Sequence, residues 1–153
     1  CGGEVLRDVP FETFIAKLPE CRKQCGDRAV LRAFHIYADN DRVAKQVAAL
    51  REGDFTTFLN LVGESGQSSW EYLQNVIPAG YKEHQEVAVT IAAAKHFLGG
   101  KGAVRVHGGG FAGTVQAFVP VELLAGFKAN MEAILGEGRC HVLSIRPEGG
   151  AVL

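Results

Sequence analysis

A run of glycines between two β-like segments is the part of this sequence best suited to chemistry. Residues 105–118 read RVHGGGFAGTVQAF, and the run itself comprises Gly108, Gly109, Gly110, Phe111, Ala112 and Gly113. Glycine loses more backbone entropy on folding than other residues and adds no packing, so such a run needs a positional reason. Left-handed backbone angles, a close approach of the main chain, or amide N–H groups gathered around an anion would each supply one.

Two phosphate-binding motifs can be excluded for this run. Gly108 to Gly113 match G-x-G-x-x-G, but a helix follows that motif in dinucleotide-binding folds, whereas TVQAFV is typical of a strand. Too few residues follow to complete a doubly wound sheet. No Lys-Ser or Lys-Thr closes the run, as a P-loop requires. Two interpretations stay open on the residues alone: a backbone nest for phosphate, and the unconstrained tip of a β-hairpin.

The other residues capable of chemistry are scattered along the chain. No two of the five histidines (His35, His84, His96, His107 and His141) stand at a metal-ligand spacing beside a carboxylate, so we predict no metal site and no catalytic residue. His107 adjoins the glycine run, but its place in a strand favours a structural role. Cys21 and Cys25 lie one helical turn apart. Cys1 and Cys140 add no second ligand pair, so we interpret Cys21 and Cys25 as two free thiols rather than a metal or redox pair.

Helices are predicted for most of the first hundred residues. The pattern of 27–54 is amphipathic, with Asp27 as a possible N-cap and Gly53 at its end. One face of it is polar, and we interpret this face as a solvated surface with weak ion pairs; its residues are Arg28, Arg32, His35, Asp39 and Arg42. Asp54 is the expected N-cap of the next helix, in which Ser65 and Ser69 are expected to serve packing. A loop at 78–84 and a helix at 83–98 follow.

The last third of the sequence changes to a β-rich pattern. Residues 103–108 and 113–119 alternate with period two, a helix is expected at 121–135, and 139–147 is expected to be a further strand. Residues 4–9 are a candidate for a fourth strand. This order predicts an α+β fold of ferredoxin-like kind, in which helices cover an antiparallel sheet of three or four strands. We expect residues 1–153 to form a single domain.

Composition excludes several classes of partner. Sixteen Lys and Arg residues stand against 17 Asp and Glu residues, so no basic surface for nucleic acid or anionic lipid is indicated. No apolar run reaches the roughly 18 residues of a membrane-spanning helix. The first residues have no signal-peptide pattern, and we expect a cytoplasmic protein.

Four stretches together resemble the galactokinases of the GHMP kinase superfamily. GAVRVHGGGFAGTVQAFVP is similar to their third conserved motif, in which Gly-Gly-Gly-Phe-Gly-Gly follows a short strand. RAFHIYADNDRV resembles their Arg-Ala-x-His helix at Arg32, Ala33 and His35. LREGDFTTFLNLVGESGQSS resembles their Leu-x-x-Gly-Asp helix pair and the Glu-Ser after it, and EVLRDV fits the segment that opens this region. The resemblance runs from about residue 4 to residue 147 and implies the C-terminal domain of such a kinase.

The resemblance implies a phosphoryl transfer that this chain does not complete alone. In the family, ATP with Mg²⁺ phosphorylates the anomeric hydroxyl of galactose, and the N-terminal domain holds the phosphate loop, the Mg²⁺ ligand, the catalytic Asp and most sugar contacts. None of those motifs is found here, so sugar and ATP are expected to bind through a missing N-terminal domain, with neither held tightly by this one. The matching loop positions are Gly108, Gly109, Gly110, Phe111 and Gly113.

Three departures from the family pattern bear on the expected activity. Ala112 stands where a further glycine is usual, and Thr114 stands where Cys is common. SSWEYLQNVIP differs from the family segment that borders the substrate, so sugar preference is left open. We expect a galactokinase-type enzyme of galactose metabolism whose isolated C-terminal domain is inactive. The alternatives are a non-catalytic ligand-sensing or interaction module derived from such a kinase, and a GHMP kinase for another small molecule.

Overall fold

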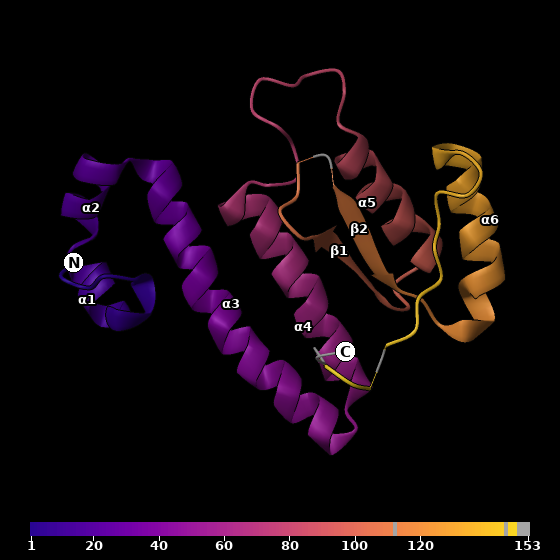
Figure 1. Cartoon of the computed structure of the whole chain (residues 1–153), viewed down its shortest axis with the longest axis horizontal. Helices are drawn as coiled ribbons and strands as arrows, with labels where there is room; N and C mark the ends of the chain where they lie inside the picture. The colour runs from indigo at the N-terminus through magenta and orange to yellow at the C-terminus, as the bar shows by residue number, and fades with distance from the viewer. Residues whose placement is uncertain (112, 146, 150–153) are drawn as a thin grey trace.

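Helices form most of the chain, and one β-hairpin packs against them (Figure 1). The computed structural model describes residues 1–111, 113–145 and 147–149. The elements follow in the order η1 (Leu6–Asp8), α1 (Phe11–Ala16), α2 (Leu18–Cys25), α3 (Asp27–Glu52), α4 (Phe55–Ser68), η2 (Ser69–Leu73), α5 (Glu86–Leu98), β1 (Ala103–His107), β2 (Thr114–Phe118), η3 (Val121–Leu123) and α6 (Leu124–Leu135).

The long helix α3 and the following helix α4 are separated by a two-residue connection that the sequence predicted. Gly53 takes the left-handed conformation, with φ 73°, and ends α3. Asp54 then caps α4, because its carboxylate accepts the backbone N–H of Thr57 at 2.9 Å. At the other end of α3 the N-cap is Gly26, and Asp27 is the first helical residue. The tight connection folds α4 back against α3 (Figure 1).

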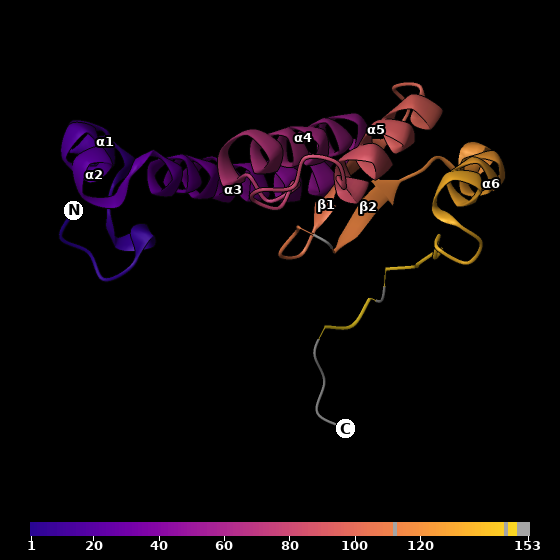
Figure 2. The same ribbon diagram turned by 90° about the horizontal axis from the view of Figure 1, so that it is seen from above.

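The hairpin supplies one wall of the main hydrophobic core. β1 and β2 pair antiparallel, from Ala103 opposite Phe118 to His107 opposite Thr114. The predicted apolar face of the second strand is confirmed, since Val115 and Ala117 pack against the buried cluster. That cluster contains Val76, Val87, Ala88, Ile91, Ala94, Leu98, Val104, Val106 and Met131. Helix α5 contacts both strands, while α4 lies along β1, so the helices form a layer beside the hairpin (Figure 2).

Two predicted strands are wrong, and with them the ferredoxin-like sheet. Within the described ranges, β1 and β2 form a two-stranded sheet and are the strands of the fold. Residues 4–9 contain the 3₁₀ turn η1 instead, because the Asp8 carboxylate accepts the N–H of Val5 and Val9 N–H bonds to Leu6 O. Residues 139–145 have no regular structure and lead away from the hairpin (Figure 2). The fold is therefore a mostly helical α+β arrangement.

The alternation of residues 139–145 misled the strand prediction because pairing needs a neighbouring strand as well as a pattern. Val142 and Leu143, neighbours that would point to opposite sides of a strand, are 62% and 87% exposed, so neither side of this segment is covered. Among the described residues, no helix is long and apolar enough to cross a membrane.

Candidate functional site

The glycine run is the connection between β1 and β2, and it uses left-handed angles at three places. Gly108 has φ +68°, Gly110 has φ +82°, and Phe111 has φ +65° despite its side chain. A non-glycine residue in this region is uncommon, and surrounding contacts must hold it there. Ala112, the sixth residue of the predicted site, lies outside the described residues.

Asn75 is the residue against which the loop packs. Its carbonyl oxygen accepts the N–H of Phe111 at 2.5 Å, and its side-chain Nδ2 donates to the carbonyl of Gly109 at 3.4 Å. A β-carbon on Gly110 would lie 2.2 Å from the same Asn75 carbonyl oxygen. Glycine at 110 is thus required by a close approach of two backbones, which is one of the reasons predicted for the run.

The loop amides are divided between internal bonds and free groups. The N–H of Phe111 bonds to Asn75, and that of Gly113 bonds to Gly110 O at 3.2 Å. The N–H groups of Gly109 and Gly110 have no acceptor among the described residues. Only part of the loop therefore has the donors that an anion-binding nest needs.

A π-helical turn places Asn75 beneath the loop. The helix η2 continues α4 with wider turns, and Gln74 then takes a left-handed angle with φ 56°. Such π-helical turns are rare and often mark functional sites. Asn75 is only 4% exposed, and its Oδ1 has no hydrogen-bond partner in the described part of the chain. Sequence reasoning missed this residue, although an Asn between Leu73 and Val76 was a visible signal.

The polar face predicted for α3 is solvated at Arg28 and Arg32, but its other three residues, His35, Asp39 and Arg42, are buried or partly buried. His35 is 4% exposed and shares a hydrogen bond of 3.0 Å with Ser68 on α4. Asp39 lies one turn later, with Oδ2 3.5 Å from His35 Nε2 and Oδ1 accepting from Arg42 at 3.1 Å. This part of the face turns inward because α4 packs on α3 and supplies partners for it.

Ser65 connects this network to the strand that leads into the glycine loop. Its hydroxyl donates to Asp39 Oδ1 at 2.7 Å and accepts from Arg105 Nη1 at 2.6 Å. The predicted packing role of Ser65 is therefore wrong: the residue bridges α3 and β1. Ser69 does fit a packing role, since it is 1% exposed and its hydroxyl has no partner among the described residues.

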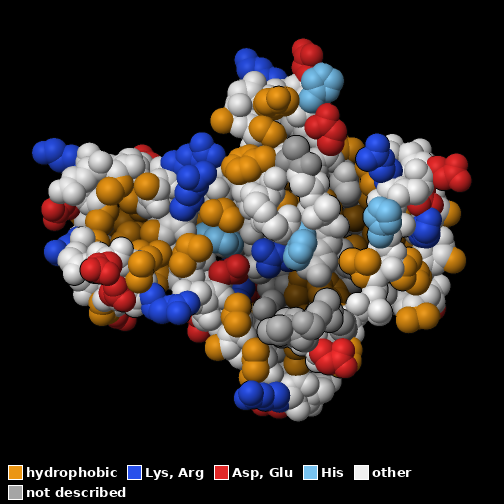
Figure 3. Space-filling model, in the orientation of Figure 1, with side chains coloured by type: hydrophobic (Ala, Val, Ile, Leu, Met, Phe, Trp, Pro, Cys, Tyr) orange, Lys and Arg blue, Asp and Glu red, His pale blue; other side chains and the backbone are white. Residues whose placement is uncertain are grey.

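Figure 3 shows histidine, basic and acidic side chains together near the middle of the face of the molecule that is seen in Figure 1.

The environment of His35 favours its neutral form. Burial lowers the pKa of His35 below its usual value, and the charges of Arg105 and Arg42 lower it further, whereas Asp39 acts in the opposite direction. A neutral imidazole can accept or donate at Nδ1 toward Ser68. The network therefore positions helices and strand rather than supplying a cation.

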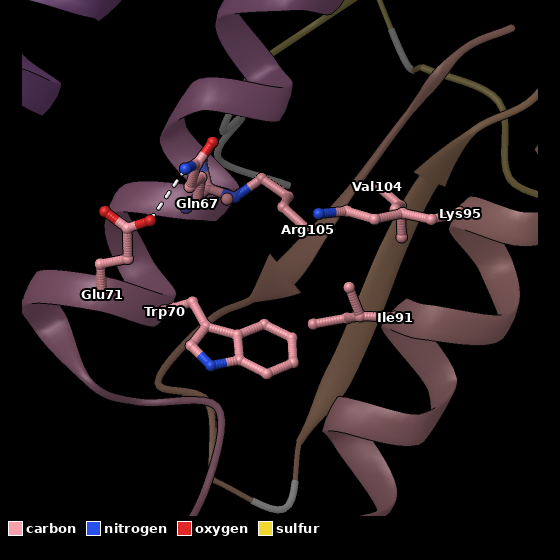
Figure 4. A pocket seen from close by; sticks show the side chains of 8 residues that line it. Gln67, Trp70, Glu71, Ile91, Lys95, Val104 and Arg105 are labelled. Carbon is pink, nitrogen blue, oxygen red and sulfur yellow. Dashed lines mark hydrogen bonds between the residues drawn. The ribbon is translucent and has the colours of Figure 1, made fainter. Parts of the chain in front are cut away.

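A separate groove of about 450 Å³ lies between α4, η2 and α5, with β1 at its floor (Figure 4). The indole of Trp70 faces Ile91 across it, and Gln67 donates to Glu71 at its rim. No residue from 108 to 111 lines this groove, nor does Gly113. The structure thus does not join the groove to the glycine loop.

The other residues considered in the sequence analysis, His107 and the cysteines, do not contribute to the contacts between the glycine loop and Asn75. His107 is exposed at the end of β1, where it pairs with Thr114 across the hairpin. No group of three or more metal-ligating side chains occurs in the described residues. Cys21, Cys25 and Cys140 are free thiols, as is Cys1.

Comparison with known proteins shows that the chain is similar to bacterial galactokinases. It is 33% identical over 121 residues to the galactokinase of Mannheimia succiniciproducens and 34% identical over 121 residues to that of Glaesserella parasuis. The chain is related to the galactokinases over part of their length. Each alignment covers 79% of this chain but 29% of the relative. A galactokinase of Actinobacillus pleuropneumoniae matches at 33% over the same length, and no family model matches.

The relation to galactokinases confirms the family resemblance predicted from the sequence motifs. The chain spans less than a third of the length of the relatives it matches. The chain therefore corresponds to one part of a galactokinase. Whether it contributes to galactokinase activity is treated below as a proposal.

Proposed function

We propose that this chain is the C-terminal domain of a galactokinase-type sugar kinase and that its glycine loop borders the transferred phosphoryl group. The observation that carries the proposal is the similarity to galactokinases over 79% of the chain. The whole enzyme would act in the cytoplasm and convert ATP and galactose to ADP and galactose 1-phosphate. The domain alone would be inactive, because the catalytic Asp and the phosphate loop implied by the resemblance belong to another domain.

The described residues fit a supporting part in that reaction. The N–H groups of Gly109 and Gly110, for which the described part of the chain offers no acceptor, are donors that could face phosphoryl oxygens. Mg²⁺ would be held by the N-terminal domain that the family resemblance implies. When bound, ATP supplies the γ-phosphoryl group. The chain's own task is then to fix main-chain dipoles beside the charge that develops during transfer.

Asn75 and the polar network would keep the loop in place for this task. Asn75 fixes the loop from beneath through Phe111 and Gly109, while Arg105, three residues before Gly108, is tied to Ser65. Preorganised donors are effective because they do not reorganise during the reaction. Contacts with the buried residue Asn75 thus set the position of the loop. The N–H groups of Gly109 and Gly110 take no part in these contacts.

A chimera tests the proposal directly. This chain would replace the matching segment of the Mannheimia succiniciproducens galactokinase, and ADP release would be measured with galactose and with a panel of other sugars. Galactose-dependent ADP release is expected. A chimera that shows the thermal unfolding and circular dichroism of a folded protein but phosphorylates no sugar would contradict the kinase proposal. Preference for another sugar would support the kinase class and revise the substrate.

Gly109 is the position at which the loop's part can be tested without disturbing the fold. A β-carbon there would meet no atom within 4 Å, and its φ is not left-handed. In an active chimera, Gly109→Val is expected to lower kcat at least about tenfold with an unchanged melting temperature, because side-chain bulk would separate amides and phosphate. Gly126→Ala on α6, which also meets no atom within 4 Å, is the matched control. Equal kcat values for the two variants would show that the loop is only the tip of a hairpin and has no part in phosphoryl transfer.

A further inference from the structure

The N-terminal segment brings two thiols together that are far apart in the sequence. The Sγ atoms of Cys1 and Cys21 are 3.5 Å apart, although 20 residues separate them. Cys1 is exposed, whereas Cys21 is partly buried on α2 and packs against a small hydrophobic cluster of Val9, Phe14 and Val30. Both line a cavity of about 210 Å³, together with Cys25. The sequence did not indicate this pair, because only Cys21 and Cys25 are close in the chain.

A series of contacts fixes the segment that carries Cys1. Gly3 lies so close to the turn η1 that a β-carbon would be 2.9 Å from side-chain atoms of both Asp8 and Val9. The hydroxyl of Tyr37 on α3 donates to the carbonyl of Val9 at 2.7 Å. Cys1 is therefore held near α2 by the chain that follows it. Its closeness to Cys21 is a property of the fold.

The geometry points to a modification site: we propose that Cys1 and Cys21 form an oxidisable dithiol that reacts with small-molecule disulfides. Sulfur atoms in a disulfide are about 2 Å apart, so closure from 3.5 Å needs a shift of about 1.5 Å. Gly2 has φ +94° and no atom within 4 Å of a β-carbon, so the backbone beside Cys1 has room for that shift. No further domain and no metal is needed.

The reaction is a thiol–disulfide exchange in two steps. The exposed thiol of Cys1 loses its proton and attacks one sulfur of the small disulfide, which forms a mixed disulfide and releases one thiolate. The thiolate of Cys21 then attacks the sulfur of Cys1, and the second small thiolate leaves. The two protons lost by the cysteines end on the two released thiols. Two protein thiols are thereby oxidised, and one small disulfide is reduced to two thiols.

Closure of this bond would fasten the N-terminal segment to α2 and to the aromatic cluster between α1 and α3. Phe14 is 3% exposed, and its ring lies 5.1 Å from that of Phe34. A cross-link over 20 residues restricts the unfolded chain, so the oxidised protein should be the more stable form. We expect its melting temperature to exceed that of the reduced protein by about 5 °C.

Tryptic mapping of the intact chain tests the proposal. Trypsin separates these three cysteines because Cys1 falls on the peptide that ends at Arg7, Cys21 on peptide 18–22 and Cys25 on peptide 24–28. After incubation of the folded chain with oxidised glutathione, the peptide ending at Arg7 linked to peptide 18–22 should be the main disulfide product. A parallel incubation in urea should distribute the cross-links among all the cysteines, because the fold no longer selects a pair.

Three variants and the melting temperature make the result decisive. Cys1→Ser and Cys21→Ser should each abolish both the cross-link and the gain in melting temperature, while Cys25→Ser should retain both. The proposal is overturned if the folded chain gives only glutathione adducts. It is also overturned if peptide 24–28 takes part in cross-links as often as peptide 18–22, or if the folded chain forms mainly disulfides between two molecules.

Discussion

A β-carbon added to Gly110 would lie 2.2 Å from the carbonyl oxygen of Asn75, closer than real β-carbons come to a backbone oxygen. This relationship separates two glycines that look equivalent in the sequence. Gly110 is fixed by the backbone of Asn75, whereas Gly109 faces open space. The glycine run thus combines a structural requirement and a possible functional one at adjacent positions.

Gly110→Ala should destabilise the chain, and Gly109→Ala should not. At position 110 the methyl group would push the loop away from Asn75 and strain a left-handed φ of +82°, so a loss of about 2–3 kcal/mol in the free energy of unfolding is expected. At position 109 the change should stay within about 0.5 kcal/mol. Urea denaturation of both variants measures the difference. Similar values for the two would mean that Asn75 does not press on Gly110.

Local signals in the sequence were sufficient for the hairpin and for helices α3, α4, α5 and α6, whereas α1 and α2 were not predicted as separate helices. Gly53 and Asp54 mark the end of α3 and the start of α4 because a left-handed cap and an N-cap depend on neighbouring residues alone. The same holds for Gly99 after α5. The strand at 139–147 was wrong because a strand depends on a partner, and alternation cannot tell whether one is present.

The candidate site was predictable only in part for the same reason. The glycine run is visible in the sequence. Its contact with Asn75 is not, because it joins residues that lie 34 to 36 positions apart in the chain. The inward turn of His35 and Asp39 likewise depends on Ser65 and Ser68 of the next helix. A pattern along one helix shows that a face is polar. Whether that face is solvated is decided by what packs on it.

The stability of the chain should fall in mildly acidic solution because of His35. Its pKa in the folded protein is lowered from 6.5, chiefly by burial, so the unfolded chain binds more protons below about pH 6.5. The free energy of unfolding should therefore decrease as the pH falls from about 7 toward 5. The charged groups facing His35 are Asp39, Arg42 and Arg105, and their net effect leaves burial dominant.

His35→Gln is the variant that checks this assignment. It should be less stable than the parent chain at pH 7, because the bond to Ser68 is disturbed, but its stability should depend less on pH between 7 and 5. His107→Gln is the control, since His107 is exposed at the end of β1. Chemical denaturation at a series of pH values gives the slopes. An unchanged slope in His35→Gln would assign the acid sensitivity to other groups.

Ser65→Ala should reveal how strongly α3 is coupled to β1. The substitution removes one hydrogen bond each from Asp39 and Arg105, and a loss of about 1–3 kcal/mol in the free energy of unfolding is expected. Ser144→Ala is the matched control, because Ser144 is exposed and should change stability by less than about 0.5 kcal/mol. A double-mutant cycle with Arg105→Met should give a coupling of at least about 0.5 kcal/mol. Strict additivity would show that the bridge stabilises nothing.

Two glycines within one helix should respond to alanine with opposite signs. A β-carbon on Gly66 of α4 would lie 2.8 Å from the β-carbon of Arg105 and 3.1 Å from the carbonyl oxygen of Val104, so α4 and β1 are in close contact there. A β-carbon on Gly63, almost one turn earlier, would meet no atom within 4 Å. Both substitutions gain about 1 kcal/mol from helix propensity, but only that at Gly66 must force the helix and strand apart.

Gly63→Ala is therefore expected to raise the free energy of unfolding by about 0.5–1 kcal/mol, and Gly66→Ala to lower it by about 1–2 kcal/mol. Thermal and urea unfolding of the two variants, measured side by side, decide the matter. Because helix propensity is the same at both positions, the difference between them isolates the contact of α4 with β1. That contact also holds Arg105 beside Ser65. A stabilising Gly66→Ala would show that α4 stands further from β1 and would remove the support proposed for the glycine loop.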